Sequence, residues 1–155
     1  MTGNDNGEHG AAQRERIANV LEGVGFSHAI SRVYAALIMA PGEGLSTGQL
    51  VAELGISKAG VSNSMQFLVG VVLVERYRVP GSREAHYRVL KGVWGDVLAR
   101  KFAAMKQMTA IIREAKAATD SPEALERLDE MEDVYSFFEE EYEAVVDRWN
   151  ERIGR

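Results

Sequence analysis

Apolar residues recur at spacings of three and four positions through most of the chain, a period typical of amphipathic helices. The pattern predicts long helices over residues 11–22, 27–39, 93–118 and 122–153, with two shorter helices between residues 45 and 70. Glycine and proline residues separate these segments. Residues 73–89 instead contain two short strand-like runs. The sequence therefore predicts a mainly α-helical protein with a small β-hairpin.

The segment before the predicted hairpin has the signals of two short capped helices. Ser46 stands at the N-cap position of the first, and Gln49 follows three residues later, which is the pattern of a capping box. Gly55 is expected to end that helix in a tight turn. Ser57 caps a second helix over residues 58–69. The buried side of this second helix is expected to contain Val61, Met65 and Leu68.

Two strand-like runs follow, over residues 73–79 and 85–89. Pro80 and Gly81 in the loop between them suit the second and third positions of a type II turn. Such a turn would lift Arg83 to an exposed tip, where a guanidinium can enter a minor groove of DNA. Helix, turn, helix and hairpin in this order describe a winged helix-turn-helix, whose usual function is to bind DNA.

Composition restricts the class of protein. The 155 residues suffice for a buried core, and 46% of them are hydrophobic, which argues against a disordered chain. There are no cysteines, so disulfides and thiolate metal sites are excluded. No apolar run approaches the roughly 18 residues that span a membrane, and no signal peptide opens the sequence. We expect a cytoplasmic protein without a membrane partner, metal or other cofactor.

The formal net charge of −5 is distributed unevenly along the chain. Residues 1–40 carry −1, residues 41–92 carry +2, residues 93–118 carry +3, and residues 119–155 carry −9. Affinity for a duplex depends on the charge that lies near the phosphates. The mildly basic helix-turn-helix and hairpin therefore permit DNA binding, although the whole chain is acidic.

The last predicted helix requires a partner. Its apolar residues repeat along one side from Leu125 to Ile153, and its outward residues are mostly acidic. A helix of this length cannot bury such a stripe against a compact winged helix alone. The preceding long helix and the first helix can cover part of the stripe, and a second copy of the chain is the simplest completion. A homodimer is therefore expected.

These observations predict four regions. Residues 1–10, which are polar and rich in glycine, are expected to be a disordered tail. Residues 11–26 would form an N-terminal dimerisation helix, and residues 27–92 a winged helix-turn-helix domain. Residues 93–155 would form the long helices of the dimerisation region.

The residues expected to contact DNA lie on the second short helix and the hairpin. Asn63 and Gln66 carry amides that can pair with adenine, and Lys58 suits a phosphate or a guanine edge. Gly60 permits close approach of the backbone. The alternative is that these side chains are simply a solvated helix face and exposed loop arginines. The full set of candidates is Ser57, Lys58, Gly60, Ser62, Asn63, Gln66, Arg76, Arg78, Arg83 and Arg88.

Two segments resemble a known family. Gly55-Ile56-Ser57-Lys58-Ala59-Gly60-Val61-Ser62 and Val79-Pro80-Gly81-Ser82-Arg83-Glu84-Ala85-His86-Tyr87 are similar to the MarR superfamily, in particular its GbsR-like branch. The resemblance implies a homodimeric bacterial transcription factor, most often a repressor, on a pseudo-palindromic operator. It assigns DNA contacts to the wing-tip Arg83 and to the helix positions Ser57, Lys58, Gly60, Ser62 and Asn63. Asn63 stands where an arginine is common, so the preference for an operator is expected to differ.

The resemblance also implies a small apolar or amphipathic effector that loosens DNA binding from a site bounded by residues 93–118. Aromatic and methionine side chains could line such a site, although the same residues at helical spacing could simply fill the core and the dimer interface. They are Phe26, Tyr34, Trp94, Phe102, Met105, Tyr135, Phe138 and Tyr142.

Two other functional classes compete with a DNA-binding regulator. His9, His28 and His86 have no spacing that assembles a metal site or an acid–base pair, and no nucleophile motif or phosphate loop is present. An enzyme is therefore not expected. A winged helix that serves as a protein–protein adaptor, without nucleic acid, is the remaining alternative.

Overall fold

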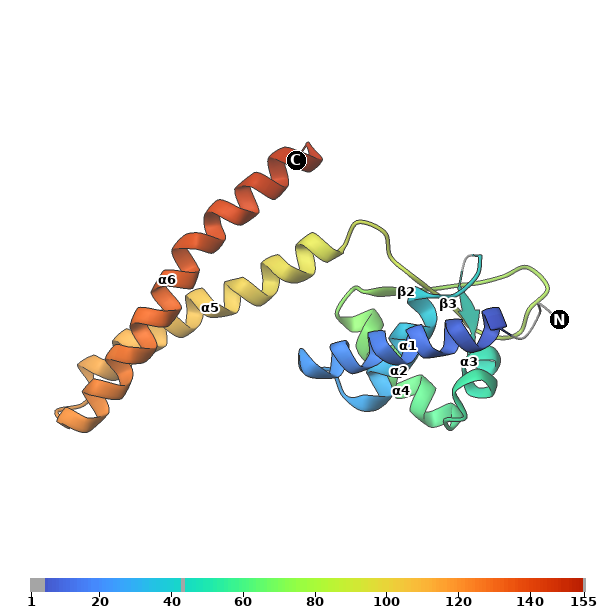
Figure 1. The fold of residues 1–155 in the computed structure, drawn as a ribbon, viewed down its shortest axis with the longest axis horizontal. Coiled ribbons are helices and arrows are strands. Elements are labelled where there is room, and N and C mark those ends of the chain that lie inside the picture. Colours follow the sequence, from blue (N-terminus) through green and yellow to red (C-terminus); the bar gives the residue numbers. More distant parts are fainter. Residues whose placement is uncertain (1–4, 43, 155) are drawn as a thin grey trace. The chain divides into compact units, whose positions relative to one another are not determined.

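The computed structural model describes residues 5–42 and 44–154 and divides the chain into two units, residues 1–93 and 94–155. Their helices and the short strands are drawn in Figure 1. The first unit contains α1 (Asp5–Gly23), α2 (His28–Ile38), β1 (Leu45–Ser46), α3 (Thr47–Leu54), α4 (Lys58–Gly70), β2 (Val74–Tyr77) and β3 (His86–Val89). The second unit contains α5 (Trp94–Ala117) and α6 (Pro122–Ile153). The predicted fold class, mainly α with a small sheet, is confirmed.

The first helix begins earlier than the apolar pattern indicated. Helix α1 starts at Asp5, so the expectation of a disordered tail over residues 1–10 is wrong for residues 5–10, and residues 1–4 lie outside the described residues. The apolar pattern did not indicate residues 5–10 because they are polar or glycine. Such residues can still extend a helix whose later turns are stabilised by packing. Those later turns bury Ala18 and Leu21. Helix α1 packs against α2 within the first unit.

The predicted helix ends of the helix-turn-helix are confirmed. The Ser46 hydroxyl accepts a hydrogen bond from the Gln49 amide over 3.1 Å, and the Gln49 side chain accepts one from the Ser46 amide over 2.7 Å. Gly55 ends α3 in the left-handed conformation, with φ of 63°. The Ser57 hydroxyl accepts a hydrogen bond from the Gly60 amide over 3.1 Å at the start of α4. The sharp turn between α3 and α4 therefore follows from local chemistry alone.

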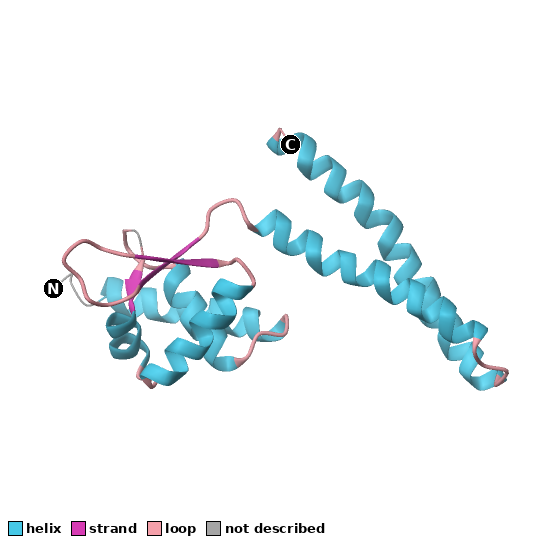
Figure 2. Ribbon diagram, turned by 180° about the vertical axis from the view of Figure 1, so that it is seen from behind, coloured by secondary structure: helices cyan, strands magenta, loops and turns pink. Residues whose placement is uncertain are grey.

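The hairpin is part of a three-stranded antiparallel sheet in the order β1-β3-β2, with the strands shown in magenta in Figure 2. The two-residue strand β1 was not predicted, and it pairs Leu45 with Tyr87. Gly44, at φ of 129°, makes this pairing possible, because a Cβ at that position would overlap the carbonyl oxygen of Tyr87. Through the pairing of β1 with β3, the sheet thus joins the start of α3 to the second strand of the wing.

The core of the first unit lies between α2, α4 and the sheet. Val33 and Tyr34 of α2, Leu50 of α3 and Leu68 of α4 are fully buried. Burial raises the pKa of Tyr34 to about 12. The predicted inner side of α4 is confirmed, since Val61, Met65 and Leu68 are all buried. This core fixes α4 with its opposite side outward.

The link from α4 to β2 contains a strained residue. Val72 has φ of 60°, and it is the one non-glycine residue with positive φ in the described part of the chain. The amide of the next residue, Leu73, donates to the Leu68 carbonyl over 3.0 Å, which is the long hydrogen bond of a Schellman motif. Glycine usually occupies this left-handed position, and a β-branched side chain is unfavourable there.

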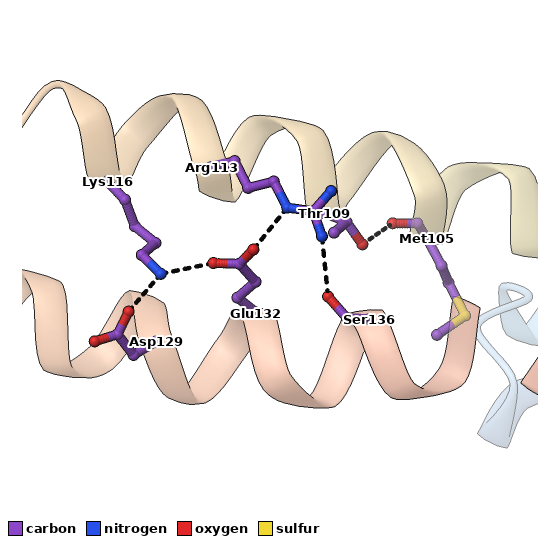
Figure 3. Close-up of polar contacts among 7 residues, drawn as sticks. All are labelled: Met105, Thr109, Arg113, Lys116, Asp129, Glu132 and Ser136. Carbon is purple, nitrogen blue, oxygen red and sulfur yellow. Dashed lines mark hydrogen bonds and ion pairs between the residues drawn. The ribbon is translucent and has the colours of Figure 1, made fainter. Parts of the chain in front are cut away.

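The second unit is a hairpin of two long helices, which lie side by side in Figures 1 and 2. Ser121 caps α6, with its hydroxyl accepting a hydrogen bond from the Ala124 amide over 3.3 Å, and Pro122 is the first residue of the helix. Polar contacts join the helices near their turn (Figure 3). Glu132 lies between Arg113 and Lys116, 2.6 Å from each cation, and Lys116 also contacts Asp129.

The helical hairpin has little interior of its own. Among its described residues, only Thr109 and Ile112, both on α5, are buried. Large apolar side chains along both helices remain between about a third and three fifths exposed. They are Trp94, Leu98, Met108, Ile111, Met131, Val134, Phe137, Phe138, Val145, Trp149 and Ile153.

Candidate nucleic-acid interface

Helix α4 presents a polar face opposite its buried side. Lys58, Ser62 and Gln66 follow one another at intervals of four residues and are all exposed, as is Asn63 beside them. At these intervals the side chains point in the same direction. Their amides, hydroxyl and ammonium match the donors and acceptors on base edges and phosphates in a major groove. The predicted residues Ser57 and Gly60 lie at the start of the same helix.

The charge on this face is favourable for a polyanion. Lys58 is the one charged residue in α4, and the helix contains no aspartate or glutamate. Its first turn, where the Ser57 hydroxyl leaves further backbone amides open, is the positive end of the helix dipole. Phosphate groups can therefore approach α4 without meeting a carboxylate of the helix itself.

The wing turn has the predicted geometry. The Ser82 amide donates to the Val79 carbonyl over 3.0 Å, and Gly81 has φ of 84°, which are the features of a type II turn with Pro80 in its second position. Arg83 follows this turn and is exposed. Its guanidinium forms no ion pair with another described residue.

The structure brings the start of α4 and the wing together. Lys58 and Arg83 line one surface hollow of about 330 Å³, whose other lining residues are Thr47, Gly48, Val51, Glu84 and Ala85. The two cations that sequence analysis assigned to different elements therefore border the same recess. A single DNA backbone that entered it would meet both cations, and also the Glu84 carboxylate.

Backbone contacts attach the wing to the first turn of α3. The Ala85 carbonyl accepts a hydrogen bond from the Thr47 amide over 3.1 Å, and the Glu84 carboxylate accepts one from the Gly48 amide over 3.3 Å. Sequence analysis missed this attachment because it joins residues 36 to 38 positions apart. The free amides at the start of any helix were the only available signal.

The other wing arginines differ in their surroundings. Arg88 pairs with Glu75 over 2.6 Å and lies 5.0 Å from the ring centre of Tyr77. Arg76 and Arg78 are exposed. The register places Tyr77 opposite His86, on the same face of the sheet as Arg88 and on the opposite face from the buried Val74. Arg76 and Arg78 are thus more accessible to phosphates than Arg88.

The residues expected around an effector are divided between the two units. Tyr34 is in the core of the first unit, where Phe26 contacts Phe67 edge-on. The other six belong to the second unit, where the rings of Phe102 and Tyr142 stack with centroids 3.3 Å apart. Phe102, Met105 and Tyr142 line a groove of about 410 Å³ between α5 and α6.

A second groove in the hairpin, of about 370 Å³, is lined by Trp94, Tyr142 and Trp149, among others. Tyr135 and Phe138 line neither of the two grooves. The second unit therefore holds two apolar recesses that share the Tyr142 ring.

Neither a metal site nor a membrane-spanning helix is found among the described residues. No cluster of three or more His, Asp or Glu side chains there has a geometry that could hold a metal ion. None of the helices in residues 5–42 and 44–154 combines the length and the apolar character that crossing a membrane requires.

Comparison with known proteins identifies the architecture. The family model described as MmpR5-like MarR family transcriptional regulator matches residues 92–152, which contain the helical hairpin. HTH-type transcriptional regulator MmpR5 of Mycobacterium tuberculosis is 22% identical over 142 residues, covering 90% of this chain and 86% of that protein. The chain is thus similar in sequence to MarR-family transcriptional regulators.

A solved structure extends the likeness to both units. The crystal structure of a transcriptional regulator covers 92% of this chain and 99% of its own, with a TM-score of 0.71 at 20% identity. In this fold, α3 and α4 are the helix-turn-helix and β2 and β3 form the wing. The matched family and relative are transcriptional regulators rather than enzymes, as expected from the sequence.

Proposed function

We propose that the chain is a sequence-specific DNA-binding transcriptional repressor that acts in the cytoplasm as a homodimer on a pseudo-palindromic operator. Helix α4 enters a major groove and reads bases with Ser62, Asn63 and Gln66, while Arg83 reaches the adjacent minor groove. The observation that carries the proposal is the shared hollow of Lys58 and Arg83 beside the acid-free face of α4.

The helical hairpin is the dimerisation region in this proposal. Phe137, Val134 and Ile111 are each more than half exposed in the single chain, a state that a second copy would relieve. The acidic charge of residues 119–155 keeps this arm soluble and repels phosphate, so DNA contacts are confined to the winged units. Two winged units would then contact half-sites about one helical turn apart.

A small apolar or amphipathic effector would release the DNA. The two grooves of the hairpin support this part of the proposal, because both are lined mainly by aromatic and aliphatic side chains. The wing motif suggested the GbsR-like branch, whereas the matching family model is MmpR5-like. We therefore propose only what both branches of the MarR superfamily would share: DNA binding by the winged helix-turn-helix, a homodimer and release by an effector.

Selection and titration test the proposal. Duplexes of about 30 base pairs, long enough for two half-sites, are selected with the protein from a random pool and then titrated by fluorescence anisotropy at several salt concentrations. We expect a selected consensus with two-fold symmetry and an affinity that falls steeply as salt rises. If no sequence were enriched from the random pool, and if the binding curve did not depend on salt, DNA recognition would be contradicted and a protein–protein adaptor would be favoured.

A further inference from the structure

The first turn of α3 is capped from two directions. Its local capping box satisfies the amides of Ser46 and Gln49. The wing satisfies the two amides between them, since Thr47 donates to the Ala85 carbonyl and Gly48 to the Glu84 carboxylate. All four amides at the start of α3 are therefore paired, and half of them depend on the wing.

The fit at Gly48 is close. A Cβ on this residue would lie 2.7 Å from one Glu84 carboxylate oxygen and 3.0 Å from the other, so only glycine leaves the carboxylate its position. Hydrogen bonding from the Ser46 hydroxyl, and then from the Gly48 amide, holds the pKa of Glu84 below its ordinary value. The charge of a carboxylate at the start of a helix is also favoured by the helix dipole.

Glu84 directly follows Arg83, and both residues line the hollow that contains Lys58. We propose that Glu84 is a positioning residue for DNA recognition: by anchoring the wing to the Gly48 amide, it holds Arg83 beside the start of α4. The anchor contributes no DNA contact of its own. This inference rests on the proposed function, because Arg83 matters here as a DNA contact.

Removing the Glu84 charge would by itself favour binding of a polyanion, so the test compares two neutral variants. In E84Q the side chain keeps an oxygen that can accept from the Gly48 amide, whereas in E84A it does not. Both are titrated against the duplexes selected with the wild-type protein. At a temperature where both variants are folded, we expect E84A to bind about fivefold more weakly than E84Q, with a salt slope lower by about one phosphate contact.

A second substitution makes the test specific to the anchor. In a G48A background the added Cβ would lie 2.7 Å from the present position of a Glu84 carboxylate oxygen, so the side chain at position 84 must move away. The difference in DNA affinity between E84Q and E84A should then largely disappear. Equal affinities of E84Q and E84A in the wild-type background, or a difference that persists with G48A, would overturn the proposal.

A measurement without DNA tests whether the Glu84–Gly48 hydrogen bond forms, independently of whether the protein binds DNA. In amide NMR spectra of the full chain, the Gly48 resonance should titrate with a pKa below 4.5 in the wild type and lose this titration in E84Q. A Gly48 chemical shift that does not change as the pH is lowered would show that the hydrogen bond between Glu84 and the Gly48 amide does not form. If the wild-type protein selects no duplex while Gly48 titrates, the proposed function fails, and the positioning role fails with it although the anchor exists.

Discussion

Glu132 on α6 accepts a hydrogen bond from Arg113 on α5 over 2.6 Å, and its second oxygen lies 2.6 Å from Lys116 (Figure 3). Hydrogen bonds from Lys116 and Arg113 lower the pKa of Glu132. A carboxyl group with a lowered pKa in the folded state stabilises the fold above its ordinary pKa of 4.5, and this contribution is lost as pH falls through the lowered value.

We therefore predict that E132Q lowers the Tm at pH 7 by a small amount, about 2 °C, because exposed ion pairs contribute little. The difference from wild type should shrink once the pH falls below 4.5. Thermal melts at fixed protein concentration between pH 3 and pH 7 measure this, with E126Q on the exposed side of α6 as control. If E132Q melted below the wild type by the same difference in Tm at every pH, the Glu132 charge would not be the cause of the stabilisation.

Arg83 is predicted to contribute to DNA affinity but not to the stability of the fold. It is exposed after the wing turn, so R83A should bind selected duplexes at least tenfold more weakly with an unchanged Tm. R127A, which removes the same charge from an exposed position of α6, is the matched control and should change the affinity less than twofold. Normal binding by R83A would show that the wing assignment is wrong.

Val72 is predicted to cost stability. Its φ of 60° is unfavourable for a β-branched residue and unstrained for glycine. V72G should therefore raise the free energy of unfolding by about 1 kcal/mol and the Tm by about 3 °C. V69G, at an ordinary helical position of α4, should lower both by a similar amount. Destabilisation by V72G, as measured by denaturant titration, would mean that packing of the valine outweighs its backbone strain.

Phe138 and Leu128 are predicted to lie in the dimer interface. Phe138 is 48% exposed in the single chain, and a carboxylate at either position would have to be buried against the second copy. F138D and L128D should shift the protein to monomers at micromolar concentration and weaken DNA binding with it. The measurement is size-exclusion chromatography with light scattering. Dimers of unchanged stability in both variants would place the interface elsewhere.

Local chemistry explains which parts of the fold were predictable from the sequence. The capping box of Ser46 and Gln49, the left-handed Gly55 and the Pro80-Gly81 turn each depend on residues within four positions of one another. Such signals can be read without knowledge of the tertiary structure. The helix-turn-helix and the wing turn were therefore predicted with their ends nearly correct.

Contacts between distant residues were not predictable in the same way. Strand β1 has two residues, and it exists because Leu45 pairs with Tyr87 across the sheet. Glu84 reaches Gly48 from a different element, and no pattern within the wing indicates that partner. The arginine assignments show the same limit, since only the strand register reveals that Arg88 pairs with Glu75 while Arg76 stays exposed.

The central claim is that two copies associate through their helical hairpins and together bind one duplex. Sedimentation velocity at micromolar concentration, with and without a selected duplex, tests it most directly. The account predicts a species of twice the 17.1 kDa chain mass in the free protein, and two chains for each bound duplex. A stable 17.1 kDa monomer that binds DNA one chain at a time would contradict it.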